Sequence, residues 1–403
     1  MPPGSMERRA DTMASTAGQL PEEKRGASPR AQSCAPSKGI VRAVPWRSMT
    51  ARSGEWDALA ADAAEPNPFF ESWYLLPSLR AFDPDGEIEI LRFEHEGRLA
   101  GLLPLVRRLS YYRWPLPFMG NWMHANSFCG TPLIARGAEV PFWQALLRWA
   151  DEHAGLALFF HLRGLPLDGV PWAALRGVLE SEDRAFRCVH REERAMLCSS
   201  QTPEDYWQAS LSGKKRKELR RQARRLADLG TVAVERLTDD RGLGEWIESF
   251  LALEHCGWKG REGSSLASDS ATRQLFGESL VGAAERGRLE RLALTLDGER
   301  IAMLATFVTA PGAFSYKTAY DEDYAAFSPG VLLQRENLAI LGREEIAWTD
   351  SCAAEDHPMI DHIWRERRSL ARINIAIGNS ARRALYASVA SRETAHPLPG
   401  DGA

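Results

Sequence analysis

Cysteine is scarce in this sequence, and long apolar runs are missing. Six cysteines are spread over 403 residues, with no CxxC pair and no histidine at zinc-ligand spacing. No metal site is therefore expected, and the thiols are expected to be reduced. No apolar run approaches the ~20 residues that span a bilayer, and the first residues lack a compact hydrophobic signal segment. These absences indicate a protein without a membrane span, and we expect a cytoplasmic location.

The chain also lacks a strong excess of either charge. Its 50 basic and 54 acidic residues leave a formal net charge of -4, which gives no global reason to expect nucleic acid as a partner. Basic charge is nevertheless concentrated between Leu211 and Gly230, around an apolar stripe that predicts a helix. The cations of this segment are Lys214, Lys215, Arg216, Lys217, Arg220, Arg221, Arg224 and Arg225. Since only Glu218 and Asp228 oppose them, the helix either has a solvated face or binds an anion.

The length of the chain exceeds what a single hydrophobic core usually organises and favours two domains. Hydrophobic residues make up 44% of the sequence, which is enough for a sizeable core. Residues 1–40 and 381–403 lack apolar periodicity and are predicted to be disordered tails, because they cannot bury enough surface to offset the entropy of ordering.

Two similar hairpins divide the region between these tails. The first joins the apolar segments 88–91 and 99–106, and the second joins 292–296 and 300–308 through Asp297-Gly298, a strong hairpin-turn signal. Helical segments alternate with the strands, which predicts an α/β architecture with mixed central sheets flanked by helices. The repetition indicates an internal duplication with domains at 41–190 and 191–380. Chance similarity is the alternative, because any two buried hairpins use the same few apolar and turn residues.

The strand 314–320 leads through an acidic loop to Ser328-Pro329-Gly330 and directly into a predicted helix. Free backbone amides and the positive end of the helix dipole favour an anion at such a position, and glycine allows close approach to the backbone. The turn therefore predicts a pyrophosphate site. The alternative is structural, with Ser328 capping the helix and Pro329 as its first residue.

Several segments together resemble the acetyltransferase family related to CelD and FemAB. They are Glu254–Gly260, the hairpin around Asp297-Gly298, Tyr316–Tyr324 and Ser328–Leu333. The resemblance covers about Val41 to Gly378 and implies two tandem GNAT-like domains, the fold of acyl-CoA N-acyltransferases. It implies transfer of an acyl group, with acetyl-CoA as the expected co-substrate and no tightly bound cofactor. Ser328, Pro329 and Gly330, with Val331 and Leu332, would then bind the donor.

The sequence departs from the simple GNAT pattern, because no Gln/Arg-x-x-Gly-x-Gly/Ala loop is present at that turn. Related enzymes of the FemAB branch take their acyl group from aminoacyl-tRNA, and the basic helix fits the phosphates of either donor. A catalytically silent GNAT-like scaffold is a third possibility. The expected acceptor is a small molecule or a glycan precursor with a free amine or hydroxyl.

Acyl transfer from a thioester requires a base, a proton source and groups that orient the acceptor. Glu254 or His255 is the candidate base, with Asp321 as a rival, and Tyr320 or Tyr324 is the candidate acid. The candidate substrate-binding residues are Trp258, Lys259, Lys317, Tyr324 and Asp350. Each of these residues also has a plain structural interpretation, as a cap, a core residue or a surface charge.

The segment Phe118–Asn126 is rich in side chains that both stack and form hydrogen bonds. It is either a loop packed by its own aromatics or a border of the cleft between the two domains. Cys352 and His357 lie close together in the sequence, but adjacency of this kind is poor evidence for a catalytic pair.

Overall fold

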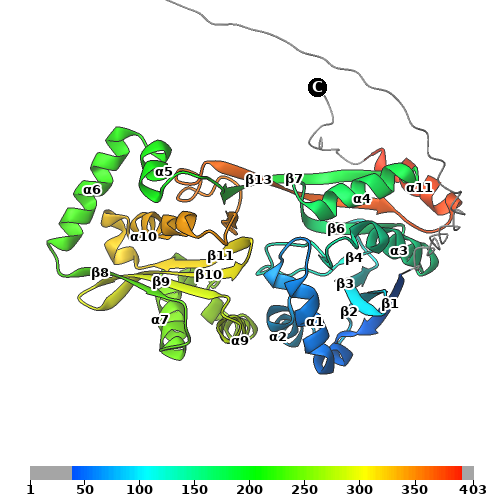
Figure 1. The fold of residues 1–403 in the computed structure, drawn as a ribbon, viewed down its shortest axis with the longest axis horizontal. Coiled ribbons are helices and arrows are strands. Elements are labelled where there is room, and N and C mark those ends of the chain that lie inside the picture. The colour runs from blue at the N-terminus through cyan, green and yellow to red at the C-terminus, as the bar shows by residue number, and fades with distance from the viewer. Residues whose placement is uncertain (1–38, 393–403) are drawn as a thin grey trace, which may run out of the picture. The chain divides into compact units, whose positions relative to one another are not determined.

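The structure, a computed structural model, describes residues 39–392 and consists of a long mixed sheet flanked by helices (Figure 1). The α/β class predicted from the sequence is therefore confirmed. The predicted N-terminal tail lies outside the described residues, apart from Gly39 and Ile40. No helix within residues 39–392 is long and apolar enough to cross a membrane.

The strands of the described region all belong to this sheet. They are β1 (Ile40–Pro45), β2 (Glu89–His95), β3 (Arg98–Arg108), β4 (Phe118–Asn121), β5 (Leu133–Ile134), β6 (Phe159–Pro166), β7 (Phe186–Leu197), β8 (Val232–Leu237), β9 (Leu289–Leu296), β10 (Glu299–Thr309), β11 (Gly312–Tyr320), β12 (Trp348–Asp350) and β13 (Glu366–Ala376). Their spatial order is β1-β2-β3-β4-β6-β13-β7-β12-β11-β10-β9-β8, and β5 pairs with β3.

The same strand pattern occurs in both halves of the sheet. In the first half, β1 to β4 form an antiparallel meander, and β4 then pairs in parallel with β6. In the second half, β8 to β11 form the same meander, and β11 pairs in parallel with β12. This order agrees with the duplication inferred from the two hairpins.

The hairpin turns have the backbone that their sequences favour. Asp297 and Gly298 have φ angles of 51° and 89°, and Glu96 and Gly97 have φ angles of 51° and 78°. Two successive left-handed residues match the twist of the flanking strands. Both predicted hairpins, β2–β3 and β9–β10, are therefore present.

The two halves exchange strands at the centre of the sheet. β13, from the end of the chain, pairs with β6 of the first half, whereas β7 pairs with β12 of the second half. β7 and β13 also pair with each other over ten positions from Glu366↔Met196 to Ile375↔Phe186. Residues 190 and 191, at the predicted division between domains, both lie within β7. The division itself stays a prediction.

Helices cover both faces of the sheet. The α-helices are α1 (Ser53–Ala61), α2 (Ser72–Phe82), α3 (Glu139–Glu152), α4 (Val170–Ser181), α5 (Pro203–Ser210), α6 (Gly213–Ala227), α7 (Leu243–Cys256), α8 (Trp258–Arg261), α9 (Ser270–Glu285), α10 (Pro329–Asn337) and α11 (Ser380–Ala390). Short 3-10 segments are η1 (Trp46–Arg52), η2 (Pro68–Phe70), η3 (Leu266–Ser268), η4 (Glu322–Phe327) and η5 (Leu338–Gly342). In Figure 1, α7 and α9 lie on one face of β8–β11, and α10 lies on the other.

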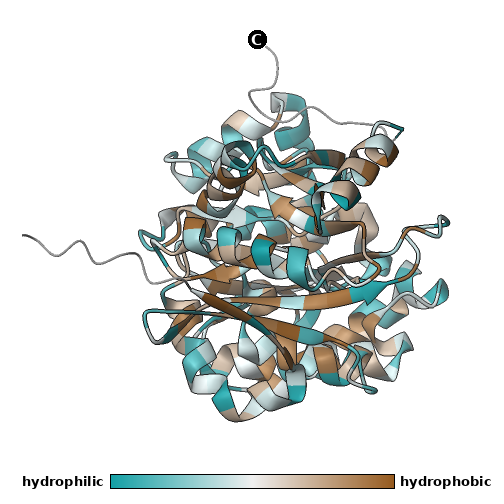
Figure 2. Ribbon diagram, turned by 90° about the vertical axis from the view of Figure 1, so that its right-hand side faces the viewer, coloured by the Kyte–Doolittle hydropathy of each residue, from teal (hydrophilic) through white to brown (hydrophobic). Residues whose placement is uncertain are grey.

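The core follows this layering. Phe250 of α7 and Phe276 of α9 pack in one apolar cluster with the sheet, and Leu333 of α10 belongs to a second cluster with Leu292 and Leu304. Figure 2 shows apolar colouring along the central strands and hydrophilic colouring on many of the outer helices. The sheet therefore forms a rigid support, and the loops at the ends of its strands carry the candidate site.

The C-terminal region differs from its prediction. Residues 380–390 form α11, where a tail was expected from residue 381. Asn379 accepts a hydrogen bond from the amide of Arg382 at 3.0 Å and caps this helix. Tyr386 and Ala390 are buried against Tyr111 and Phe159. The helix is thus capped at its start and packed against the first half through Tyr386 and Ala390. Residues 393–403 lie outside the described region.

Candidate active site

The strands β11 and β12 separate after a short ladder. They pair in parallel only from Gly312↔Trp348 to Phe314↔Asp350. β11 then continues to Tyr320, whereas the chain after Asp350 turns away from it. A pocket of about 620 Å³ occupies the resulting opening, and a pocket of this size accommodates an extended small-molecule ligand.

This opening, here called the β11–β12 wedge, is lined from four parts of the second half. The lining residues are Trp258, Lys259, Thr318, Tyr320, Ala325, Ser328, Pro329, Gly330, Val331, His357, Pro358 and Met359. Seven sequence candidates for the site are in this set, namely Trp258, Lys259, Tyr320, Ser328, Pro329, Gly330 and Val331. The fold therefore gathers the predicted donor turn and part of the predicted acceptor set around one cavity.

The donor turn lies at the N-terminus of α10. Ser328 occupies the N-cap position with a φ angle of 54°, and Pro329 is the first helical residue, but the Ser328 side chain makes no cap hydrogen bond. Its carbonyl accepts from the amides of Val331 and Leu332 at 3.0 and 3.1 Å. Pro329 has no amide hydrogen, and the amide of Gly330 lies in the first turn, where no intrahelical acceptor exists. The positive end of α10 thus faces the wedge.

Gly330 is closely surrounded at this turn. A Cβ atom at residue 330 would lie 2.9 Å from Sδ of Met359 and 3.4 Å from Cδ1 of Tyr320. Both neighbours line the wedge, so any side chain at position 330 would occupy part of the pocket. Glycine therefore keeps the backbone accessible to a ligand.

The basic helix α6 lies beside the same turn. Gln222 donates to the carbonyl of Ala326 at 3.2 Å, and the guanidinium of Arg225 lies 5.4 Å from the ring centroid of Phe327. These contacts hold α6 against η4, directly before Ser328. Within residues 39–392, Arg221 is the only α6 cation that forms an ion pair, with Glu218 at 2.7 Å. Arg216 donates to the carbonyls of Gln208 and Leu211, whereas Arg225 lies nearest to the turn at Ser328 through its contact with Phe327.

The equivalent helix of the first half has no such site. α3 begins at Glu139, whose carboxylate accepts from the amide of Gly137 at 3.1 Å. An acidic side chain therefore occupies the helix N-terminus that in α10 is left open. This difference favours a single donor site, in the second half.

The end of α7 and the short α8 form another wall of the wedge. Glu254 is buried, its Oε1 accepts from Nζ of Lys259 at 2.7 Å, and its Oε2 accepts from the amide of Leu266 at 2.8 Å. Both carboxylate oxygens are thus engaged. His255 is exposed and contacts Ser265 at 3.0 Å through Nδ1. The helix breaks at Gly257, as the sequence predicts, and Trp258 is left 47% exposed at the pocket mouth.

Lys317 lies between the two halves. Its Nζ donates to Oδ1 of Asn126 at 2.8 Å and lies 5.1 Å from the ring centroid of Phe128. Burial, and next the nearby Lys259 ammonium, lower the pKa of Lys317 to about 8. Asn126 ends the aromatic segment that the sequence placed either at an interdomain cleft or in a self-packed loop. Its hydrogen bond to Lys317 agrees with the first alternative.

The remaining candidates make local structural contacts and do not line the wedge. Asp321 accepts from the amide of Asp323 at 2.9 Å and caps η4. Tyr324 packs near Phe327, and Leu332 is buried in the core beneath α10. Asp350 is buried, with its Oδ1 accepting from the amide of Cys352 at 2.7 Å and lying 3.5 Å from Arg194.

Five lining residues are not among the sequence candidates, namely Thr318, Ala325, His357, Pro358 and Met359. Thr318 lies on β11, and His357 and Met359 follow β12. Burial lowers the pKa of His357 below its ordinary value. Thr318 follows the candidate Lys317 directly in β11, so the sequence of this strand could have indicated it as a site residue. The placement of His357 depends on how the chain turns after Asp350, for which the sequence gives no clear signal.

Most residues that line the wedge lie in a part of the chain that matches a known protein family. Residues 213–357 match the family model described as an acetyltransferase (GNAT) domain. The match begins with α6 and ends at His357, so it covers most of the residues that line the wedge. The second half of the chain therefore contains a GNAT-type acetyltransferase domain. No curated protein sequence matches the chain.

The chain is also similar to solved structures, and this similarity covers most of the fold. FemX has 11% sequence identity and a TM-score of 0.52, and the alignment covers 84% of this chain and 98% of FemX. A conserved protein of unknown function from Bacteroides thetaiotaomicron has 12% identity and a TM-score of 0.53, with 80% and 97% covered. At these identities the likeness concerns the fold alone. The GNAT-like fold is confirmed, while the narrower CelD and FemAB assignment stays a prediction.

Proposed function

We propose that the protein is an acyltransferase that moves an acyl group, most simply acetyl, from acyl-CoA to an amine or hydroxyl of an acceptor. The observation that carries this proposal is the β11–β12 wedge, in which the open N-terminus of α10 faces a cavity between separated strands. The GNAT-type match over residues 213–357 supports the same reaction.

In this proposal the donor binds in the wedge through its phosphates. The amide of Gly330 receives the pyrophosphate, and Arg225 of α6 is close enough to η4 to add charge stabilisation. The pantetheine arm then follows β11 past Tyr320 and Thr318. The thioester is thereby brought toward Lys317, at the border with the first half.

Lys317 is proposed as the proton acceptor for the attacking group. A lysine with a pKa of about 8 is partly neutral near physiological pH, and its hydrogen bond to Asn126 orients the amine. Glu254 is then a positioning residue that holds Lys259, and Tyr320 is the proposed proton source for the leaving thiolate. No tightly bound cofactor is required by this scheme.

Thermal unfolding with acyl-CoA tests the proposal. A ligand at about a hundred times its dissociation constant adds roughly 2.7 kcal/mol to stability. For a protein of this size, the unfolding temperature is then expected to rise by roughly 5 °C. Acetyl-CoA is compared with longer acyl-CoAs, and ATP is the control for general phosphate binding. If no thioester raises the unfolding temperature, the CoA donor is wrong.

An aminoacyl-tRNA donor is the second candidate, because most α6 cations are exposed and α6 borders the wedge. The resemblance to the FemAB branch supports this alternative. Lys217, Arg220 and Arg224 are spaced three and four residues apart and share one helix face, whereas Arg225 lies against η4.

Charge reversal on these two faces separates the donors. With CoA as donor, Arg225→Glu is expected to weaken CoA binding about tenfold, and the triple variant Lys217→Glu/Arg220→Glu/Arg224→Glu is expected to leave it nearly unchanged. With a charged tRNA as donor, the triple variant abolishes tRNA binding, and the wild-type affinity falls steeply with salt. Titrations at 50 and 200 mM salt measure both results.

A further inference from the structure

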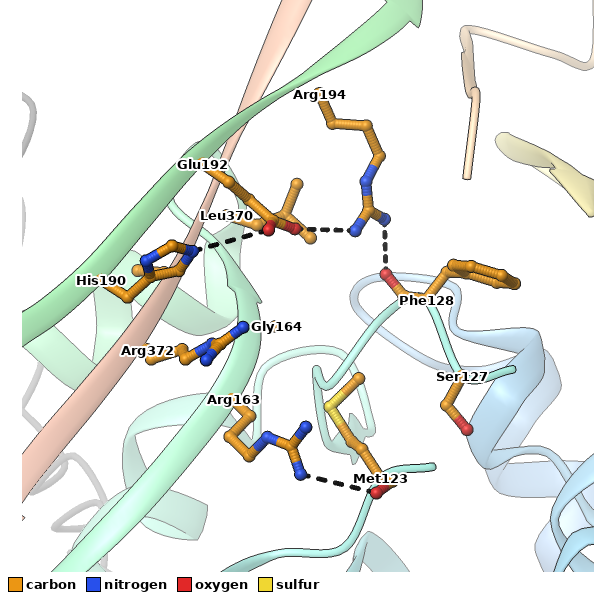
Figure 3. Close-up of a pocket in the computed structure, with 11 residues that line it drawn as sticks. Met123, Ser127, Phe128, Arg163, Gly164, His190, Glu192, Arg194, Leu370 and Arg372 are labelled. Atoms are coloured by element: carbon orange, nitrogen blue, oxygen red, sulfur yellow. Dashed lines mark hydrogen bonds and ion pairs between the residues drawn. The ribbon is translucent and has the colours of Figure 1, made fainter. Parts of the chain in front are cut away.

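A second pocket lies in the first half, beside the segment that contacts Lys317. It is bordered by β6, β7, β13 and the loop after β4, and Figure 3 shows three arginines directed into it. The lining residues are Met123, Ser127, Phe128, Arg163, Gly164, His190, Glu192, Arg194, Leu370, Ala371 and Arg372. Here it is called the arginine pocket.

Two of these arginines, Arg163 and Arg372, lack an acidic partner in the described part of the chain. Within residues 39–392, no ion pair joins either of them to a carboxylate. Arg163 reaches only the carbonyl of Met123, at 3.5 Å, and Arg372 donates to the hydroxyl of Tyr112 at 2.9 Å. Burial and then the charge of Arg372 lower the pKa of Arg163. The two guanidinium groups therefore repel each other in the unliganded protein.

The acidic residue of the pocket is already neutralised. Glu192 accepts from Arg194 at 2.9 Å and lies 3.7 Å from Nε2 of His190. Arg194 also donates to the carbonyl of Phe128 at 2.6 Å and lies 3.5 Å from Asp350. Arg194 is 7% exposed, and its Nε is buried without a hydrogen-bond partner. The lining of the pocket thus has an excess of positive charge. Nε of Arg194 is a hydrogen-bond donor without an acceptor.

The arginine pocket is linked to Lys317 through Phe128. Phe128 lines the pocket, and its ring lies beneath Nζ of Lys317. Lys259, which lines the donor wedge, also influences the charge of Lys317. A group in the arginine pocket therefore lies on the acceptor side of Lys317.

We propose that the arginine pocket binds a phosphate or carboxylate group of the acceptor, held by Arg163 and Arg372. Planar guanidinium groups bind both anions through paired hydrogen bonds. The assignment of this anion to the acceptor rests on the proposed acyl transfer. It restricts the acceptor to molecules that carry an anionic group near the amine or hydroxyl that is acylated.

Calorimetric titration with inorganic phosphate and, separately, with acetate tests this inference. Each titration is run with and without saturating CoA, on the wild type, on Arg163→Gln and on Arg372→Gln. Arg136→Gln is the control, because Arg136 is an exposed arginine of the same half. One of the two anions is expected to bind, with its Kd at least tenfold higher in each pocket variant and unchanged in the control. The preferred anion identifies the group as phosphate or carboxylate.

Unfolding temperatures separate ligand binding from a structural role. Removing one of two repelling charges is expected to leave the unliganded protein as stable as the wild type or more stable. A clear loss of stability in both pocket variants, or anion affinity that neither variant changes, would overturn the inference. If phosphate binding is lost in Gly330→Trp but kept in both arginine variants, phosphate binds at the donor turn and the arginine pocket is not a site. If CoA fails to bind while anion binding still depends on Arg163 and Arg372, acyl-CoA transfer is wrong and the pocket stands as an anion site.

Discussion

Replacing Lys317 with methionine is expected to lower kcat/KM for acyl transfer by a factor of about 100 or more at pH 8, because a positioned proton acceptor contributes this much. The wild type is expected to gain activity with rising pH through about 8, where Lys317 becomes neutral. Lys317→Met removes this rising limb. Initial rates of CoA thiol release across pH 6 to 10 measure both effects.

The stability of Lys317→Met distinguishes catalysis from structural support. The pKa of Lys317 is lowered in the folded state, so its protonated form opposes folding below about pH 8, and this opposition fades as pH rises toward the pKa of the unfolded chain. Methionine removes that penalty and keeps most of the volume, although Oδ1 of Asn126 loses its donor. We expect little change in the unfolding free energy at pH 7. A pH profile in Lys317→Met that matches the wild type would exclude Lys317 as the proton acceptor.

Gly330→Trp is expected to weaken CoA binding at least 100-fold. The indole would fill the wedge between Tyr320 and Met359, which a Cβ atom at this position already approaches, and it would displace the pyrophosphate from the helix N-terminus. Titration calorimetry with CoA measures the loss. Gly177→Trp is the matched control, because Gly177 is exposed on α4 and a Cβ atom added there would meet no atom within 4 Å.

A smaller substitution gives a graded test at the same position. Gly330→Ala brings a Cβ to 2.9 Å from Sδ of Met359 and is expected to weaken CoA binding to a smaller extent. Met359→Ala in the same chain removes the contacting sulfur and is expected to restore part of the affinity. CoA binding that is unchanged in Gly330→Trp would show that the donor does not occupy the wedge.

Local signals in the sequence were sufficient for the hairpins and for the start of α10. Asp297-Gly298 specifies its turn through two adjacent residues, and Ser328-Pro329-Gly330 marks the start of a helix. The strand exchange that involves β7 and β13 could not be predicted from local signals. A strand carries the same alternating pattern whichever neighbour it pairs with, so its partner is fixed only by the complete fold.

The chemical role of single residues could also not be predicted from the neighbouring sequence. Glu254 looked like a base because it ends a helix beside a Gly-Trp turn, yet Lys259 and Leu266 occupy its oxygens. The lowered pKa of Lys317 arises from burial that includes Asn126, 191 positions away in the chain. The arginine pocket likewise draws its three arginines from β6, β7 and β13. Each of these properties depends on long-range contacts that composition and spacing do not encode.

A crystal structure of the protein with bound CoA is the most direct measurement. The proposed function predicts the pyrophosphate at the amide of Gly330, with the pantetheine arm between β11 and the segment 357–359 and the sulfur directed toward Lys317. CoA bound at another surface, or a wedge left empty at saturating CoA, would contradict a donor site between β11 and β12.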